Sequence, residues 1–318
     1  MSSSRRVALL GAGVVGSRLV KRIGASPGRR VVDIDTRRVD LATTPFLDDA
    51  AVAVLAHPGP HHPDTISLLD RGISVISVGD QAADVDAMMW ESERANRSGA
   101  TLVVGAGMSP GLVGLVARHL ASQLAQLDEI HVAIHGTAGP ACARQHHRAL
   151  AGHATAFDDG AFVTARAGTG RELAWFPEPV GAYDCYRAEV PAPVVLHRTF
   201  PQAGRITARM SANRRDRLTS RLPMLTPPHS EGGVGALRVE VRGADATGAR
   251  ATLVAGIAEM VGTATAATAT AYLDALLDGA LPVGLVLPGD DRVDTLRLLR
   301  SVERAGVRLQ EFTGVPTA

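Results

Sequence analysis

The first part of the chain alternates between two patterns of apolar residues. Segments with the length of buried strands lie at residues 7–10, 29–33, 51–56, 73–78 and 101–104. Between them, apolar residues recur at helical spacing over residues 17–23, 64–71 and 82–97. Strands that alternate with helices predict a parallel, doubly wound α/β sheet. Ligands of such sheets bind at the carboxyl ends of the strands, so we expect the loops at His57, Gly79 and Gly105 to share one edge.

The pattern changes at Asp128. Apolar and polar residues now alternate along short segments at residues 130–135, 160–166, 194–200, 237–242 and 251–259. Strands with one polar face predict a mostly antiparallel sheet and therefore an α+β second domain. The turn-rich residues 243–250 predict a hairpin between the last two strands. Residues 209–230 show no periodicity and are expected to form a long loop.

The C-terminal part begins with a run of small residues. A helix is predicted from Val261 to Leu277, and a last helix, which Asp290 could cap, ends near Arg304. A strand-like segment follows at residues 307–312. We therefore divide the chain into residues 1–127, 128–260 and 261–318, with the last unit packing back on the first.

A glycine-rich turn follows the first predicted strand. Val7–Leu10 leads into Gly11-Ala-Gly13-Val14-Val15-Gly16, and a helix comes next. Gly11 would permit the tight turn, Gly13 would let the backbone approach phosphates, and Gly16 would let helix and strand pack closely. The free N–H groups at the start of the helix, around Val14 and Val15, would face the anion. This stretch predicts a seat for the pyrophosphate of a dinucleotide.

The end of the second strand predicts which dinucleotide binds. Asp33 and Asp35 both lie there, and a carboxylate at this point would accept hydrogen bonds from the adenosine ribose; Asp33 is favoured by its distance from Gly16. A carboxylate about 4 Å from a 2′-phosphate would cost ~4 kcal/mol per charge pair at an effective dielectric near 20. This favours NAD. Arg37 and Arg38 follow at once and could bind the 2′-phosphate, so NADP stays open.

Composition narrows the classes of function. The chain of 318 residues is 46% hydrophobic and 20% charged, as in soluble globular enzymes, and its net charge of +1 gives no electrostatic case for nucleic acid or an anionic membrane. Lys21 is the only lysine and lies beyond the glycine turn, so lysine-based catalysis is not expected. Cys142 and Cys185 are too few and too far apart for a zinc site or a disulfide framework. We expect no metal and a reducing, cytoplasmic environment.

A polar cluster at residues 136–148 is one candidate for the chemistry. Arg144 and Arg148 are four residues apart and would share one helical face, where they could hold a substrate carboxylate. His146 or His147 could then act as the acid or base. The alternative is that this histidine pair is solvated or caps the helix.

A second polar cluster lies between prolines at residues 177–187, and we interpret it as a loop. Tyr183 or Asp184 could contact substrate or exchange a proton there. The alternative is an edge loop whose tyrosines only cover the sheet.

In three places the sequence resembles the saccharopine dehydrogenase-like NAD(P)-dependent oxidoreductases. The first is the glycine turn at residues 11–16. The second and most specific is Gly105-x-Gly107-Met108-Ser109-Pro110-Gly111-Leu112, which is similar to the family's Gly-x-Gly-x-x-Pro-Gly-Leu junction. The third is the C-terminal run at residues 262–289, which is similar to the family's helix and following loop. Residues 128–238 carry no signature of the family.

The resemblance implies a Rossmann-type domain that binds NAD or NADP, with a mixed second domain for substrate. It also implies hydride transfer at a carbon next to nitrogen or oxygen, in an amino-acid-derived imine, amine or carbonyl compound. The residues that would hold the cofactor are Gly11, Gly13 and Gly16 at the pyrophosphate, Asp33 at the ribose, and Gly105 and Met108 at the nicotinamide. The loop His57-Pro58-Gly59 replaces a small apolar or glycine-rich turn usual in the family, and it is expected to contact cofactor or substrate.

Two other interpretations stay open. The missing lysine and the histidine loop fit a regulator or an isomerase that holds NAD(P) without net redox turnover. The protein could also oxidise an alcohol, as homoserine dehydrogenase does, because enzymes of that kind share the first domain. The lone Lys21 counts against lysine-assisted chemistry of that kind. In each case the partner is a small molecule rather than nucleic acid or membrane, and we expect a homodimer formed through the sheet of the second domain.

Overall fold

The strands of the first part form a six-stranded parallel sheet in the computed structural model, which describes residues 5–26, 29–35 and 39–312. Its strand order is β14-β5-β4-β3-β1-β2. The strands are β1 (Arg5–Leu10), β2 (Arg29–Ile34), β3 (Ala50–Leu55), β4 (Ser74–Ser77), β5 (Thr101–Val103) and β14 (Gly284–Val286). The chain leaves β1 for β2 on one side and returns to β3 on the other. Doubly wound sheets bind ligands at such a reversal.

Four helices accompany this sheet: α1 (Val14–Gly24), α2 (His62–Asp70), α3 (Ala82–Met89) and α4 (Ser92–Ser98). The sequence predicted one helix where α3 and α4 are separate. The chain turns between them at Trp90 and Glu91. The Glu91 carboxylate is 2.8 Å from Nε2 of His62 and 2.8 Å from Nε of Arg94, and these contacts fix the turn. The predicted parallel α/β sheet is confirmed.

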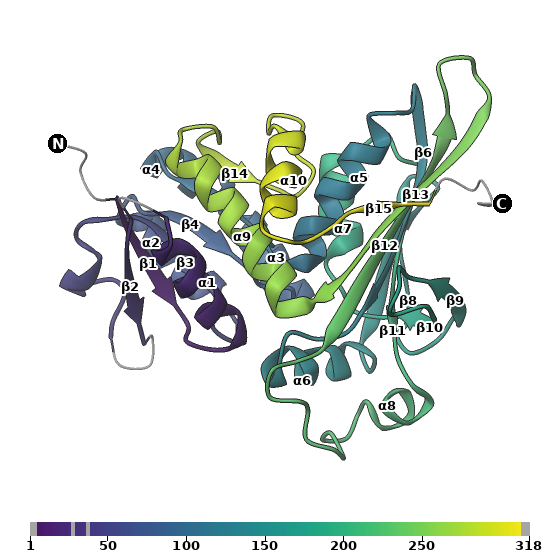
Figure 1. Cartoon of the computed structure of the whole chain (residues 1–318), viewed down its shortest axis with the longest axis horizontal. Coiled ribbons are helices and arrows are strands. Elements are labelled where there is room, and N and C mark those ends of the chain that lie inside the picture. Colours follow the sequence, from purple (N-terminus) through teal and green to yellow (C-terminus); the bar gives the residue numbers. More distant parts are fainter. Residues whose placement is uncertain (1–4, 27–28, 36–38, 313–318) are drawn as a thin grey trace.

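The second sheet has nine strands, and Figure 1 shows it nearly edge-on. Its order is β15-β13-β12-β6-β11-β10-β9, and β7 pairs with β11 and β8. Its strands are β6 (Gln126–His135), β7 (His153–Asp158), β8 (Ala161–Arg166), β9 (Glu172–Trp175), β10 (Ala182–Arg187), β11 (Arg205–Ser211), β12 (Val234–Ala244), β13 (Arg250–Met260) and β15 (Gln310–Glu311). Only the β6–β11 pair is parallel among these described strands. The mostly antiparallel second sheet and its β12–β13 hairpin are therefore confirmed.

Several local predictions in this domain are wrong. The predicted strand at residues 194–200 is the helix α7 (Ala192–Thr199), whose buried residues Ala192, Val195 and Leu196 follow helical spacing. The segment 177–187, interpreted as a loop, contains β10. The expected loop at 209–230 begins inside β11 and includes the short helix α8 (Arg214–Thr219). The last helix, α10 (Thr295–Arg304), is capped by Asp294 and not by Asp290.

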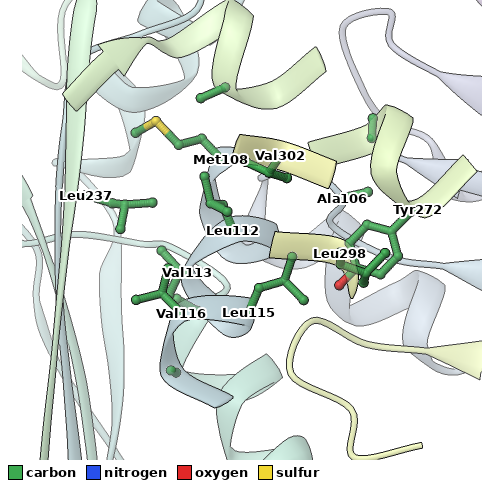
Figure 2. Packing of buried hydrophobic residues seen from close by; sticks show 14 of the residues in the cluster. Ala106, Met108, Leu112, Val113, Leu115, Val116, Leu237, Tyr272, Leu298 and Val302 are labelled. Atoms are coloured by element: carbon green, nitrogen blue, oxygen red, sulfur yellow. The ribbon is translucent and has the colours of Figure 1, made fainter. Parts of the chain in front are cut away.

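A layer of helices lies between the two sheets (Figure 1). It contains α5 (Val113–Ala121), α9 (Val261–Leu277) and α10, and the irregular turn η2 (Met108–Leu112) leads into it. Figure 2 shows Met108, Leu112 and Val116 of this layer beside Leu237 of β12, with Leu298 of α10 near Tyr272 of α9. One apolar core therefore joins the two sheets. No helix in the described parts of the chain is long and apolar enough to cross a bilayer.

The C-terminal residues return to both sheets. Helix α9 packs on α1, and β14 adds to the first sheet beside β5. Strand β15 instead pairs with β13 of the second sheet. The remaining helix of the second domain is α6 (Pro140–Ala149), which follows β6 and lies below the first domain in Figure 1.

Candidate functional site

The glycine turn after β1 is packed as tightly as its spacing predicts. Gly11 has φ +124°, and a Cβ there would lie 2.4 Å from the backbone nitrogen of His57. A Cβ on Gly16 would lie 1.7 Å from the carbonyl oxygen of Gly11. A Cβ on Gly13 would meet nothing within 4 Å. Two glycines thus allow the close packing, and the third leaves the turn open.

Helix α1 begins at this open point. Gly13 is its N-cap residue, and no side chain of the described residues caps it or places an acidic group in its first turn. The first backbone N–H groups of a helix lack partners within the helix, and the helix dipole favours negative charge there. The start of α1 at Val14 and Val15 is therefore a suitable seat for a phosphate group.

A cavity of about 520 Å³ opens at the reversal between β1 and β3. One wall comes from the glycine turn, the loops after β3 and β4, and the turn before α5; the other comes from β6 and α6 of the second domain. Of the predicted cofactor residues, those that line it are Gly13, Val14, Val15, His57, Pro58, Gly59 and Met108. Gly11, Gly16 and Gly105 support the wall from behind. Gly105 has φ +74°, and a Cβ there would lie 2.6 Å from Cγ of Pro110.

The histidine loop after β3 places His57 between two hydrogen-bond acceptors at the edge of this cavity. Nδ1 of His57 lies 2.9 Å from the carbonyl oxygen of Pro58, and Nε2 lies 2.9 Å from Oδ2 of Asp64. Both ring nitrogens face acceptors, which suits the imidazolium form. Burial lowers the pKa of His57, but Asp64 and the Pro58 carbonyl outweigh it and raise this pKa above the usual value.

Behind it, His61 is buried and neutral. Its Nε2–H donates to the carbonyl oxygen of His57 at 2.8 Å, and its Nδ1 accepts from Oγ of Ser77 at 2.7 Å. Burial lowers the pKa of His61, and the positive charge on His57 lowers it further. The buried Asp84 accepts from the backbone N–H groups of His61 and His62, at 2.7 and 2.9 Å. These bonds fix the loop that His57 occupies.

Helix α6 brings the predicted substrate residues to the opposite wall. Arg144 and Arg148 both line the cavity, and so does His146. His147 points away: its Nε2–H donates to the carbonyl oxygens of Thr219 and Leu222, each at 3.1 Å. The buried His147 thus anchors the segment after α8 and has no access to the cavity.

The second polar cluster lies outside the cavity. Tyr183 and Asp184 are on β10, and neither lines the cavity. The ring of Tyr183 packs 4.1 Å from that of His135, and Asp184 pairs with Arg171 at 2.9 Å. The segment interpreted as a loop contains a strand near the edge of the sheet, which explains why its polar residues are remote from the glycine turn.

The two acidic residues of the second strand differ in position. Asp33 lies inside β2, paired in register with Leu9, whereas Asp35 follows the end of the strand. The glycine turn begins directly after Leu10, which pairs with Ile34. Asp35 therefore lies closer than Asp33 to the level of this turn. Arg37 and Arg38 lie outside the described residues.

Around His146 the structure assembles a cluster that the sequence analysis missed. Nε2 of His146 lies 3.1 Å from Oδ2 of Asp80 and 3.7 Å from Sγ of Cys142. The Nε2 amide of Gln145 donates to the other carboxylate oxygen of Asp80 at 2.6 Å. Burial lowers the pKa of His146, but Cys142 and Asp80 together raise it well above the usual value. The spacing of Cys142 and His146, four apart on a helix, was the available signal, whereas Asp80 comes from the distant loop after β4.

The fold and the cavity together define a two-domain protein with a dinucleotide-type parallel sheet and a second sheet that closes over its carboxyl edge. No protein-family profile matches the sequence, and no curated protein does. The solved structures do match. The apo saccharopine dehydrogenase (L-Glu forming) of Saccharomyces cerevisiae has a TM-score of 0.73 at 14% identity, covering 97% of this chain and 99% of that chain.

Two further structures are similar. One is the DAP dehydrogenase of C. glutamicum in complex with DAP, with a TM-score of 0.56 at 16% identity, covering 93% of this chain and 96% of that one. The other is an engineered D-amino acid dehydrogenase bound to NADP+, with a TM-score of 0.54 at 16% identity and the same coverage. The chain therefore has the saccharopine dehydrogenase-like fold that its motifs resembled.

Proposed function

We propose that this protein is an NAD(P)-dependent oxidoreductase that transfers hydride to or from an amino-acid-derived substrate, at a carbon bonded to nitrogen or oxygen. The observation that carries the proposal is the cavity at the β1–β3 reversal. One of its walls is an open glycine turn with an uncapped helix start, and the facing wall carries two arginines. The similar structures include dehydrogenases whose titles name saccharopine, DAP and D-amino acids.

In this proposal the pyrophosphate binds at Gly13, Val14 and Val15, where free backbone N–H groups and the helix dipole favour an anion. His57, whose pKa is raised by Asp64 and the Pro58 carbonyl, lies at the same edge of the cavity and would add positive charge there when protonated. Asp35, at the end of β2, would accept hydrogen bonds from the adenosine ribose, with Asp33 as the alternative. The nicotinamide would lie toward Met108, between the two domains.

The substrate would bind against α6. Arg144 and Arg148 are one helical turn apart and line the cavity, so they suit a substrate carboxylate. Of the four acid–base candidates in the sequence, His146 is the one that reaches the cavity. We therefore expect the reacting carbon of the substrate to lie at the His146 end of the wall, beside Asp80.

Cofactor binding tests this proposal directly. Titration of the protein into NADH and, separately, NADPH should enhance and shift the fluorescence of at least one of them. Replacing Asp35 with Ser should weaken NADH binding more than replacing Asp33 with Ser does. Absence of binding to both cofactors would contradict the proposed function, and an effect of Asp33 alone would return the ribose contact to that residue.

Replacement of the arginines tests the substrate side. Arg144→Met and Arg148→Met should each raise KM for an amino-acid substrate about tenfold or more, since a charge-assisted hydrogen bond contributes about 1.5–3 kcal/mol. NADH affinity should stay unchanged. If both variants instead keep KM and lose cofactor binding, the arginines hold the cofactor and not the substrate.

A further inference from the structure

Three side chains of different chemistry bring one donor atom each to the same point of the cavity wall. These atoms are Oδ2 of Asp80, Sγ of Cys142 and Nε2 of His146, and all lie within 4.8 Å of one another. The separations are 3.1 Å from His146 to Asp80, 3.7 Å from His146 to Cys142 and 4.0 Å from Cys142 to Asp80. All three residues line the cavity.

We propose that Asp80, Cys142 and His146 are the protein ligands of a zinc ion whose fourth position opens into the cavity. Tetrahedral zinc with bonds of about 2.0–2.3 Å to N, O and S places its ligand atoms about 3.3–3.6 Å apart. The three observed separations lie close to this range. Three protein ligands and one open position are typical of catalytic zinc, and a thiolate beside an imidazole favours zinc over magnesium or calcium.

The direction of the contacts distinguishes a metal site from a proton relay. In a relay, the carboxylate orients the histidine through one ring nitrogen and the nucleophile contacts the other. Here Asp80 and Cys142 both approach Nε2 of His146. Sγ of Cys142 also lies 4.0 Å from Oδ2 of Asp80, so the three atoms converge on one point, where a single cation could take all three as ligands.

The surrounding structure fixes the three ligands. Cys142 and His146 are four residues apart on α6 and therefore share one face of that helix. Gln145 donates to the second oxygen of the Asp80 carboxylate at 2.6 Å, as outer residues commonly do around a metal. Asp80 belongs to the first domain and α6 to the second, so the ion would also bridge the domains.

The chemical consequence rests on the proposed function, whereas zinc binding itself does not. A carbonyl or hydroxyl oxygen on the reacting carbon would take the open position, and the ion would stabilise its negative charge. In the oxidative direction, the hydroxyl proton leaves to solvent, the C–H bond breaks, and hydride with both electrons passes to NAD(P)+. In the reductive direction, hydride adds to the carbonyl carbon and the alkoxide takes a proton. The site therefore favours oxygen substrates, alcohols or carbonyl compounds, over amines.

Metal analysis of the protein, produced without a metal-binding tag, tests the inference. After incubation with zinc and gel filtration we expect about one zinc per chain by elemental mass spectrometry. Cobalt substitution should give intense visible bands and a thiolate-to-cobalt band in the near ultraviolet. Cys142→Ser should abolish the thiolate band, and Asp80→Asn and His146→Gln should each lower zinc affinity at least tenfold. Cys185→Ala, which changes the other cysteine, should alter neither the thiolate band nor the zinc affinity.

NADH titration of the same samples separates the two proposals. Cofactor binding without zinc or a cobalt–thiolate band would overturn the metal site and leave the proposed function standing. Zinc binding without affinity for either cofactor would overturn the proposed function and leave the metal site standing. Rapid alkylation of Cys142 that zinc does not slow would also overturn the inference, because it would identify the cluster as a metal-free thiol–imidazole pair.

Discussion

Gly16 shows at the scale of one residue how the predicted phosphate seat depends on close packing. A Cβ at this position would lie 1.7 Å from the oxygen and 2.8 Å from the carbon of the Gly11 carbonyl, both of them backbone atoms. We predict that Gly16→Ala displaces the turn, lowers the free energy of unfolding by about 1–3 kcal/mol and weakens NADH binding at least tenfold. Urea denaturation and fluorescence titration measure the two effects.

Gly24 is the matched control, because it is the last residue of the same helix and a Cβ there meets nothing within 4 Å. Gly24→Ala should leave cofactor affinity unchanged and raise stability by up to about 1 kcal/mol, since alanine restricts the unfolded chain. Equal effects of the two substitutions would show that Gly16 acts through helix propensity and not through the turn.

The ion pair between His57 and Asp64 makes stability depend on pH. The pKa of His57 is raised in the folded protein, chiefly by Asp64, against the effect of burial. A raised folded pKa contributes stability that is fully present below the unfolded value of 6.5 and is lost as pH rises through the folded value. We therefore predict that Asp64→Asn lowers the free energy of unfolding by about 1–2 kcal/mol near pH 6 and by less near pH 9.

Urea denaturation at the two pH values measures this difference. The pKa of the neighbouring His61 is also shifted, downward, so the comparison is between variant and wild type at each pH. Asp49→Asn serves as the control, because Asp49 is exposed and pairs with Arg6 only at 3.4 Å. A larger effect of Asp64→Asn at pH 9 than at pH 6 would contradict the assigned charge state of His57.

The residues of the site fall into two groups: those that belong to one local sequence motif, and those that come together from distant parts of the chain. Gly11, Gly13 and Gly16 form a local motif whose geometry follows from neighbouring backbone, so the sequence predicts it. The cluster of Asp80 with α6 depends on how two domains meet, and no spacing along the chain encodes that contact. The expectation of no metal rested on the distance between Cys142 and Cys185. It gave no weight to Cys142 and His146 on one helical face.

Among the elements, α10 separates an apolar face from an exposed one within a single turn. Leu298 is 1% exposed and Leu296 is 48% exposed. In Figure 2, Leu298 lies near Tyr272 of α9. We predict that Leu298→Ala lowers the free energy of unfolding by about 2–5 kcal/mol, whereas Leu296→Ala changes it by less than about 0.5 kcal/mol. Thermal and urea unfolding of both variants measure this, and similar losses would mean that α10 packs differently.

Helix α7 shows why element type was harder to predict than element position. Residues 194–200 contain an apolar run too short to distinguish a buried strand from a buried helix by periodicity. Pro191 and Pro193 lie at the start of the helix, where proline is tolerated, and they offered the better signal. The longer patterns, such as the two strands of the β12–β13 hairpin, left no such ambiguity and were predicted correctly.

For the whole molecule, the return of the C-terminal part explains how the two sheets hold one cavity between them. Strand β14 completes the first sheet and β15 extends the second, while α9 packs on α1 between them. The sequence predicts a helix at α9 from its small residues. It does not predict that β14 and β15 join different sheets, because strand partners are set by tertiary contacts and not by local pattern.

The remaining expectation is a homodimer, and the far edge of the second sheet is the surface that would form its interface. Strand β9 ends the sheet among the described strands, and Leu173 and Trp175 on one of its faces are 55% and 63% exposed. An edge strand with exposed apolar side chains is a template for pairing with another chain. We predict that the wild type is a dimer and that Leu173→Glu combined with Trp175→Glu yields a monomer, because burying two carboxylates at the interface without partners is strongly unfavourable. Light scattering after gel filtration gives the mass of the particle. Leu296→Glu on α10, another exposed leucine, is the control. A wild-type monomer or a dimeric double variant would exclude this edge as the interface.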